Sequence, residues 1–100
     1  MDGDDFEWDE RKNRGNLRKH GLDFADAWEV FRGPMLVHAD VREDYGEDRW
    51  LGIGILRGQA VFLVFTQPQP DVIRIISMRK ASRNEREEYE RAIQDRLETH

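Results

Sequence analysis

The side chains best equipped for chemistry in this sequence are cationic, and they are concentrated in two short stretches. The first stretch contains Arg11, Lys12, Arg14, Arg18 and Lys19, and the second contains Arg74, Arg79 and Lys80. Guanidinium and ammonium groups donate hydrogen bonds to phosphate oxygens and neutralise their charge. If folding brings the two stretches together, the protein will present a local cationic site suited to a phosphate group.

Two arginines interrupt apolar rows in predicted strands. Arg49 and Arg74 each alternate in register with aliphatic side chains, so each guanidinium points toward an apolar face. An interior guanidinium needs an acceptor, either a nearby carboxylate or the phosphate of a ligand. The carboxylates considered for such pairing are Glu43, Asp44 and Asp48. Arg79 has the opposite parity to Arg74, so the two can share a site only if the strand ends or bulges near residues 77–79.

The composition describes one small domain with an acidic surface. A chain of 100 residues, 38% hydrophobic and 37% charged, can form one core, which predicts a single domain over residues 1–100. The formal net charge of −5 argues against simple electrostatic attachment to nucleic acid. The lack of cysteine excludes disulfides and thiol chemistry and is typical of the cytoplasm. We find no pattern typical of a membrane span or signal peptide and expect neither export nor membrane insertion.

The sequence does not show the spacing of a metal site. The three histidines, His20, His38 and His100, are scattered along the chain. The aspartates and glutamates do not cluster at ligand spacing either. We therefore predict no metal and no other cofactor.

The N-terminal part predicts a short strand followed by a helix with an unusual packing side. Residues 6–8 alternate like an edge strand, and residues 9–20 follow as a helix between a capping Asp9 and a terminating Gly21. The side of this helix that should pack on a sheet is polar, since its residues are Asn13, Asn16, Leu17 and His20. We expect the helix to dock through polar groups, with both asparagines structural, or to leave a face open for a ligand.

A second helix should follow almost at once. Asp23 can cap it, and the Gly-Pro pair at residues 33–34 ends it. Phe24, Trp28 and Phe31 recur at helical spacing, so we expect all three on a buried face.

The rest of the chain predicts strands and one more helix. The predicted strands span residues 35–39, 49–57, 60–67 and 72–79. Gly58 and Gln59 would form a tight turn and residues 67–71 a stiff loop, so the strands form an antiparallel meander. A capping box of Ser82 and Glu85 opens a last helix that ends near residue 97. The fold class is therefore α+β: a short N-terminal strand, two helices, a four-stranded antiparallel meander and a C-terminal helix.

Three segments carry a family resemblance. The first contains Phe6-Glu7-Trp8-Asp9, Lys12, Asn16, Lys19-His20-Gly21, Phe24 and Ala27; the second contains Arg49 and Ile53-Gly54; the third contains Arg74 to Ser82, Arg83, Glu85 and Tyr89. Together and in this order, they resemble the signature of BrnT-type toxins of bacterial type II toxin–antitoxin modules, which have the RelE-like fold. The order of predicted elements agrees with that fold.

The resemblance implies a metal-independent endoribonuclease that cleaves messenger RNA until a cognate antitoxin protein neutralises it. A ribose 2′-hydroxyl is deprotonated and attacks the adjacent phosphate, which requires a base, cations and an acid for the leaving 5′-oxygen. His20 is a candidate base or acid because imidazole titrates near neutral pH, although a lysine could also take the proton. The candidate catalytic cations are Lys19, Arg49, Arg74 and Arg79, and Lys12 and Lys80 are expected to bind substrate phosphates.

This hypothesis makes a spatial demand. Cationic groups far apart in the sequence, with His20, Arg49 and Arg79 among them, must gather around one hollow the size of a phosphodiester. The acidic total charge predicts weak long-range attraction of RNA, which the ribosome could offset by orienting the substrate.

Two other interpretations stay open at this point. A non-catalytic RelE-like module that binds an antitoxin-type protein would keep the fold without the reaction. A stand-alone, sequence-specific DNA binder is disfavoured because no helix-turn-helix recognition helix is visible.

Overall fold

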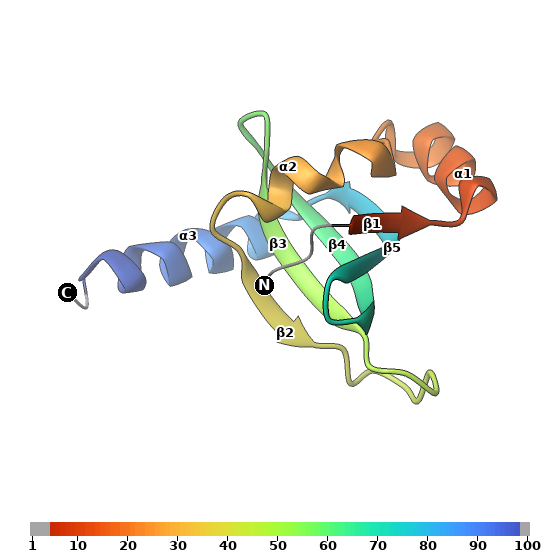
Figure 1. Cartoon of the computed structure of the whole chain (residues 1–100). Helices are drawn as coiled ribbons and strands as arrows, with labels where there is room; N and C mark the ends of the chain where they lie inside the picture. The colour runs from red at the N-terminus through yellow and green to blue at the C-terminus, as the bar shows by residue number, and fades with distance from the viewer. Residues whose placement is uncertain (1–4, 99–100) are drawn as a thin grey trace.

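The computed structural model describes residues 5–98, which form a five-stranded sheet with helices packed on both faces (Figure 1). The strands are β1 (Asp5–Trp8), β2 (Leu36–Ala39), β3 (Trp50–Leu56), β4 (Gln59–Gln69) and β5 (Val72–Lys80). The helical segments are α1 (Glu10–His20), the 3₁₀ turn η1 (Phe24–Asp26), α2 (Ala27–Phe31) and α3 (Arg83–Glu98). The predicted α+β class and order of elements are confirmed.

The strand order is β1-β5-β4-β3-β2. The strands from β2 to β5 pair antiparallel in sequence order, which confirms the predicted meander. The N-terminal strand β1 pairs parallel with β5, and this register sets Glu7 opposite Arg74. Two segments separated by most of the chain therefore lie side by side at one edge of the sheet.

Each face of the sheet has its own apolar core. On one face, Phe24, Ala27 and Val30 from η1 and α2 pack against strand residues that include Phe65 and Ile75. On the other face, Tyr89 of α3 packs with a second group of strand residues, namely Ile53, Phe62 and Val64. Figure 1 shows α2 and α3 on opposite sides of the sheet.

The helix α1 docks on β5 through amides, as its polar packing side predicted. The side chain of Asn16 donates to the Met78 carbonyl at 2.8 Å and accepts from the Met78 amide at 3.2 Å. Asn13 accepts from the Phe24 amide at 2.8 Å. These bonds satisfy buried groups that an apolar helix would leave unpaired, so α1 is held in a defined position beside the sheet.

The helix ends also follow local rules. Asp9 accepts hydrogen bonds from the first-turn amides of α1, and Gly21 ends the helix with φ 72°. The capping box of α3 is formed: the Ser82 amide donates to Glu85 at 2.8 Å and the Glu85 amide donates to the Ser82 hydroxyl at 3.2 Å. The last turn of α3 extends beyond the sheet, which leaves Leu97 66% exposed.

The prediction that Trp28 belongs to the core is wrong. Trp28 is 44% exposed, whereas Ala27 and Val30 are fully buried. The cause is the 3₁₀ turn at the start of this element, because three residues per turn align position 27 with position 24. Val30 then follows Ala27 on the same side of α2. Trp28 instead lies under the guanidinium of Arg32, 5.6 Å from its carbon to the ring centre.

Two strand boundaries also differ from the prediction. The β3–β4 turn is made by Arg57 and Gly58, not by Gly58 and Gln59, and both turn residues have positive φ, 49° and 84°. Positive φ at both central positions is the requirement of the tight type I′ hairpin. The strand β4 extends to Gln69 instead of ending at a loop from residue 67, and its pairing becomes irregular after Thr66. None of the helices in residues 5–98 is both long and apolar enough to span a membrane.

Candidate phosphate-binding pocket

A row of polar side chains crosses the sheet on the face that carries α3. Glu7 of β1 is paired with Arg74 of β5, and Arg74 is paired with Thr66 of β4. Arg49 immediately precedes Trp50, which pairs with Phe65, so Arg49 neighbours Thr66 across the next strand boundary. The row brings together residues from the beginning, middle and end of the sequence.

A bulge in β5 sets which arginines share this face. Val64 pairs with Ser77 and Phe65 pairs with Ile75, so Ile76 is an extra residue without its own partner. An extra residue reverses the alternation of side chains beyond it. Ile76 packs against the core beneath α3, and the guanidinium of Arg79 lies over Phe62 in that same core. The bulge that the hypothesis required is therefore present, one residue earlier than predicted.

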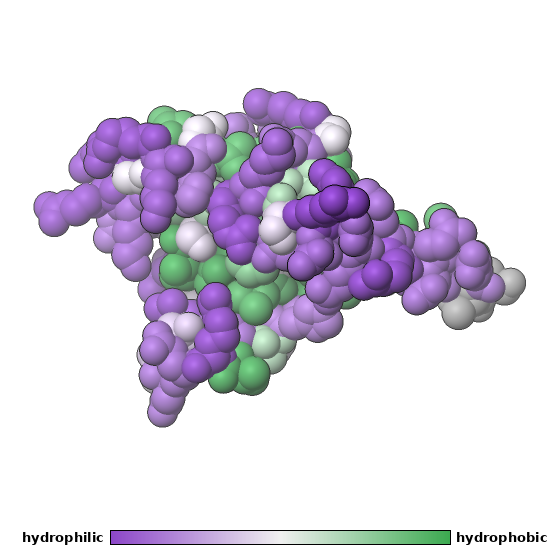
Figure 2. Space-filling view, turned by 180° about the vertical axis from the view of Figure 1, so that it is seen from behind, coloured by the Kyte–Doolittle hydropathy of each residue, from purple (hydrophilic) through white to green (hydrophobic). Residues whose placement is uncertain are grey.

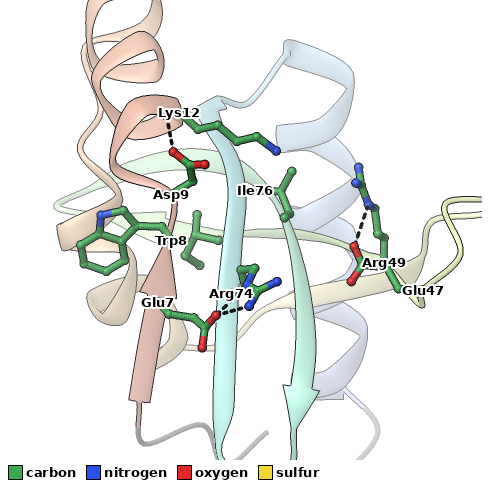
Figure 3. A pocket seen from close by; sticks show the side chains of 9 residues that line it. Glu7, Trp8, Asp9, Lys12, Glu47, Arg49, Arg74 and Ile76 are labelled. Atoms are coloured by element: carbon green, nitrogen blue, oxygen red, sulfur yellow. Dashed lines mark hydrogen bonds and ion pairs between the residues drawn. The ribbon is translucent and has the colours of Figure 1, made fainter.

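A pocket of about 340 Å³ opens over part of this row (Figure 3). Its lining residues are Glu7, Trp8, Asp9, Lys12, Glu47, Arg49, Arg74, Ile75 and Ile76. Figure 3 shows Lys12 reaching from the first turn of α1 across the sheet, with Arg49 and Arg74 on other sides of the pocket. Three cations from three separate elements thus surround one hollow of the volume typical of small-ligand sites.

The two pocket arginines have carboxylate partners of unequal strength. Arg74 Nε donates to Glu7 at 2.6 Å, and the pair is partly exposed. Arg49 Nε lies 3.9 Å from the Glu47 carboxylate, beyond hydrogen-bond distance. Glu47 is therefore the partner of Arg49, and the predicted partners Glu43, Asp44 and Asp48 are not. Glu7 is the partner of Arg74, and the sequence did not reveal this pairing either.

Two buried polar atoms in the row have no hydrogen-bond partner within residues 5–98. They are Arg49 Nε and Thr66 Oγ1, and Thr66 is only 2% exposed. Leaving a buried donor or acceptor unsatisfied typically costs about 1–3 kcal/mol. The two atoms belong to neighbouring residues, so the sheet carries unused hydrogen-bonding capacity at the pocket's edge.

The loop before β3 positions Arg49. The Tyr45 ring lies 4.0 Å from the Arg49 guanidinium carbon, a stacked cation–π contact. Asp40, at the start of the loop, accepts two hydrogen bonds from the Arg42 guanidinium, at 2.8 and 2.7 Å. These side-chain bonds lower the pKa of Asp40 to about 2. The Asp40 amide also donates to the Arg49 carbonyl at 2.8 Å, which closes the loop at the pocket.

The other predicted site residues lie outside this pocket. Lys19 and His20 are exposed at the C-terminal end of α1, and His20 is eight residues, or about 12 Å along a helix, beyond Lys12. Lys80 is exposed at the end of β5. Arg79 shares the face, but Glu85 accepts hydrogen bonds from both its terminal nitrogens, at 2.8 and 2.9 Å. The pocket therefore brings together Lys12, Arg49 and Arg74, and its lining includes neither His20 nor Arg79.

The carboxylates of the pocket escaped the sequence analysis. The sequence places Glu7 and Asp9 in an edge strand, a helix cap and the family signature but does not indicate that they line a site, and Glu47 lies in a loop of several acidic residues. The alternation within residues 6–8 could have indicated the side to which Glu7 points, but not its strand neighbour. Within residues 5–98, no group of three histidine, aspartate or glutamate side chains has the geometry of a metal site. Metal independence stays a prediction.

The fold is of the α+β class, with a pocket on its sheet lined by three cations and three carboxylates, and comparison with known proteins identifies its family. Residues 8–85 match the family described as "Ribonuclease toxin, BrnT, of type II toxin-antitoxin system". This chain belongs to that family. Among solved structures, it is similar to the Brucella abortus ribonuclease toxin BrnT, with 33% identity and a TM-score of 0.62 over 79% of this chain and 97% of that one. No protein with a curated description matches.

Family membership defines the activity class. The chain is a ribonuclease toxin of the type II toxin–antitoxin class, an endoribonuclease with RNA as its substrate and an antitoxin protein as its partner. The nuclease interpretation is thus supported over the non-catalytic binding module. The resemblance read from the three sequence segments is confirmed.

Proposed function

We propose that the pocket between α1, β3 and β5 is where RNA is cleaved, by attack of a ribose 2′-hydroxyl on its neighbouring phosphate without a metal ion. The observation that carries the proposal is the convergence of Lys12, Arg49 and Arg74 on one hollow. The transition state concentrates negative charge on the phosphate oxygens, and preorganised cations stabilise that charge most strongly. The reaction forms a 2′,3′-cyclic phosphate and releases a 5′-hydroxyl.

Arg49 and Arg74 bind the scissile phosphate in this account. Both guanidinium groups already face carboxylates, whose oxygens resemble those of a phosphate in charge and hydrogen-bonding geometry. An incoming phosphate exchanges with Glu7 at Arg74, and it meets little competition at Arg49, whose Nε has no hydrogen-bond partner in the described chain. Lys12 then neutralises the leaving 5′-oxygen and supplies its proton.

Glu47 is the proposed general base. Asp9 is occupied as a helix cap, and hydrogen bonds from the amides of Lys12 and Arg11 lower its pKa. Glu7 is held by the guanidinium of Arg74. Glu47 accepts no hydrogen bond from any described residue and is 43% exposed, so its carboxylate is free to take the 2′-proton.

His20 is an alternative general base, and Arg79 is an alternative phosphate-binding residue. Neither could act in this pocket without a change in the position of the substrate or of the side chain. His20 lies at the far end of α1 from Lys12 and would serve as base only if the substrate extended to it. Arg79 would have to release Glu85 to reach a phosphate. The catalytic roles predicted for Lys19, His20 and Arg79 stay predictions, as does phosphate binding by Lys80.

The biological setting follows from the substrate. Messenger RNA is found in the cytoplasm, so we place the activity there, and an acidic toxin gains from a ribosome that presents the RNA to it. We also propose that the chain alone does not read DNA sequence. The helix that follows α1 and its turn, α2, has only five residues and buries Ala27 and Val30, whereas recognition of a DNA sequence requires an element that enters a groove.

Product analysis tests the proposal. The protein freed of its antitoxin should cleave RNA in EDTA and leave a 2′,3′-cyclic phosphate, and a single 2′-deoxy substitution at the cleaved nucleotide should block the cut. Glu47→Gln should lower kcat by about 100-fold, since general bases contribute about 10²–10⁴-fold. Glu87→Gln on α3 is the matched control and should leave kcat unchanged. Cleavage that stops in EDTA, or an unchanged rate in Glu47→Gln, would refute the proposed mechanism.

A further inference from the structure

The helix α1 carries a concentration of positive charge, of which the pocket uses only Lys12. Its cationic residues are Arg11, Lys12, Arg14, Arg18 and Lys19, all exposed, against a single acid, Glu10. None of the five is within ion-pair distance of a described carboxylate, whereas the arginines of the sheet and of the first turns of α3 are paired. In a protein of net charge −5, this helix stands out as an unneutralised cationic surface.

The cationic side chains of α1 lie in two rows: one contains Arg11, Arg14 and Arg18, and the other contains Lys12 and Lys19. Asn13 and Asn16 face the sheet, where both are buried. Arg11, Arg14 and Arg18 are spaced three and four residues apart, which places them in one row on the outward side of the helix. This spacing makes α1 a cationic ridge beside the pocket. A helix of 11 residues is about 16 Å long, enough to contact several successive phosphates.

The ridge and the pocket are connected through one helix. Lys12 lines the pocket and belongs to the first turn of the same helix. The two asparagines fix α1 on β5 and η1, so the distance between the ridge and the pocket is set by the fold. A strand of RNA with one phosphate in the pocket would have its neighbouring phosphates within reach of α1.

The chemistry of the ridge fits a polyanion better than a protein partner. Stable protein interfaces are centred on buried apolar or aromatic anchors. The outward row of α1 has none, and Gly15, between this row and Lys12, has nothing within 4 Å of an added Cβ. In Figure 2, where α1 lies at the upper left, this part of the surface is mainly hydrophilic.

We infer that the outward arginines of α1 form a second binding site that holds the RNA backbone next to the cleaved bond. The inference rests on the proposed cleavage in the neighbouring pocket. Long-range attraction to the whole protein is weak because of its acidic total charge, so a local ridge must supply most of the backbone affinity. The ridge contributes affinity for longer RNA and takes no part in the chemical step.

Binding of an uncleavable RNA tests the inference directly. The probe is a fully 2′-O-methylated 20-nucleotide RNA, which lacks the attacking hydroxyl, titrated against the full chain freed of antitoxin at several salt concentrations. The test variant is Arg11→Gln with Arg14→Gln and Arg18→Gln. The control is Arg83→Gln with Arg86→Gln and Arg91→Gln, which removes the same charge from α3.

The α1 variant should bind at least about tenfold more weakly at physiological salt, and its slope of log affinity against log salt should fall by about 2, since each phosphate contact on a single strand contributes about 0.7. The α3 control should stay within about threefold of the unaltered protein. Equal losses in both variants would overturn the inference, because net charge alone would explain them. Unchanged RNA binding with weaker antitoxin binding would also overturn it and make α1 a protein interface.

A third variant separates this inference from the pocket proposal. Arg49→Ala combined with Arg74→Ala removes the pocket cations and leaves α1 intact. If only this variant loses affinity, the ridge is refuted and the pocket stands. If only the α1 variant loses affinity, the ridge stands and the pocket is not a phosphate site.

Discussion

Arg74 and Arg79 project from the same face of β5, although five positions separate them, because Ile76 bulges out of its pairing with β4. In a regular strand, residues an odd number apart point to opposite faces. The bulge lets one strand carry a pocket arginine near its start and, near its end, an arginine that anchors α3. The site and the C-terminal helix therefore share one side of the sheet.

Replacing Arg79 with alanine tests its anchoring role. Arg79 makes a bidentate contact with Glu85 and covers the Phe62 ring. We expect the free energy of unfolding to fall by about 2 kcal/mol, since hydrogen bonds to charged groups contribute about 1.5–3 kcal/mol. Urea denaturation measures the loss. Arg83→Ala removes an exposed ion pair with Glu87, one helical turn away, and should lower the free energy of unfolding by less than about 0.5 kcal/mol. Similar losses in the two variants would contradict the anchoring role of Arg79.

Two glycines should respond to alanine in opposite directions. Gly15 lies inside α1 with open space around it, so Gly15→Ala should raise the free energy of unfolding by up to about 1 kcal/mol through helix propensity. At Gly54 in β3, an added Cβ would lie 2.6 Å from Val30 Cγ1 of α2. Gly54→Ala should therefore lower the free energy of unfolding by about 1–3 kcal/mol. Thermal melts of both variants measure the change in stability. Stabilisation by Gly54→Ala would show that α2 does not pack as described.

The pairing of Asp40 with Arg42 predicts a pH dependence of stability. Hydrogen bonds from Arg42 lower the pKa of Asp40 from the ordinary value of 3.8 to about 2. A depressed carboxylate pKa stabilises the folded state fully above the ordinary value, and this contribution is lost as the pH falls through the folded-state pKa. The stability difference between the unaltered protein and Asp40→Asn should be constant from pH 7 to about pH 5 and shrink between about pH 4 and pH 2. A difference that does not change over that lower range would show that the pair does not hold the loop.

Tyr45 is expected to act by positioning Arg49. The two side chains are stacked, and an exposed cation–π contact contributes about 0.5–1 kcal/mol. Tyr45→Ala should lower kcat/KM for RNA by about fivefold without changing the unfolding midpoint by much, because the ring is only half-buried. Tyr45→Phe keeps the stacked ring and should restore the rate. Failure of phenylalanine to restore it would assign the effect to the hydroxyl instead of the stack.

Features that depend on neighbouring residues were predictable from the sequence. Asp9, Gly21 and the Ser82–Glu85 box act within a few residues of the chain, and all three form as expected. The polar docking of α1 was also predictable, because Asn13 and Asn16 lie on the one side that had to meet the sheet. The error at Trp28 arose because a 3₁₀ turn replaced the assumed α-helical spacing.

The site depended on relationships between distant strands. Nothing local to Glu7 indicates that β1 runs parallel to β5 with Arg74 as its neighbour. The bulge at Ile76 is a property of the register between two strands and not of either strand alone. The sequence offered these residues only as a group of candidates. The fold separates Lys12, Arg49 and Arg74, which line the pocket, from Lys19, His20, Arg79 and Lys80, which do not.

Single-turnover cleavage of RNA by Arg49→Ala and Arg74→Ala tests the central claim most directly. Both variants should remain folded and lose at least about 100-fold in rate, since one preorganised donor to the reacting oxygens contributes about 10²–10³-fold. Arg83→Ala, which removes an arginine of α3, should cleave at the rate of the unaltered protein. Full activity in either pocket variant, with the fold intact, would contradict the account.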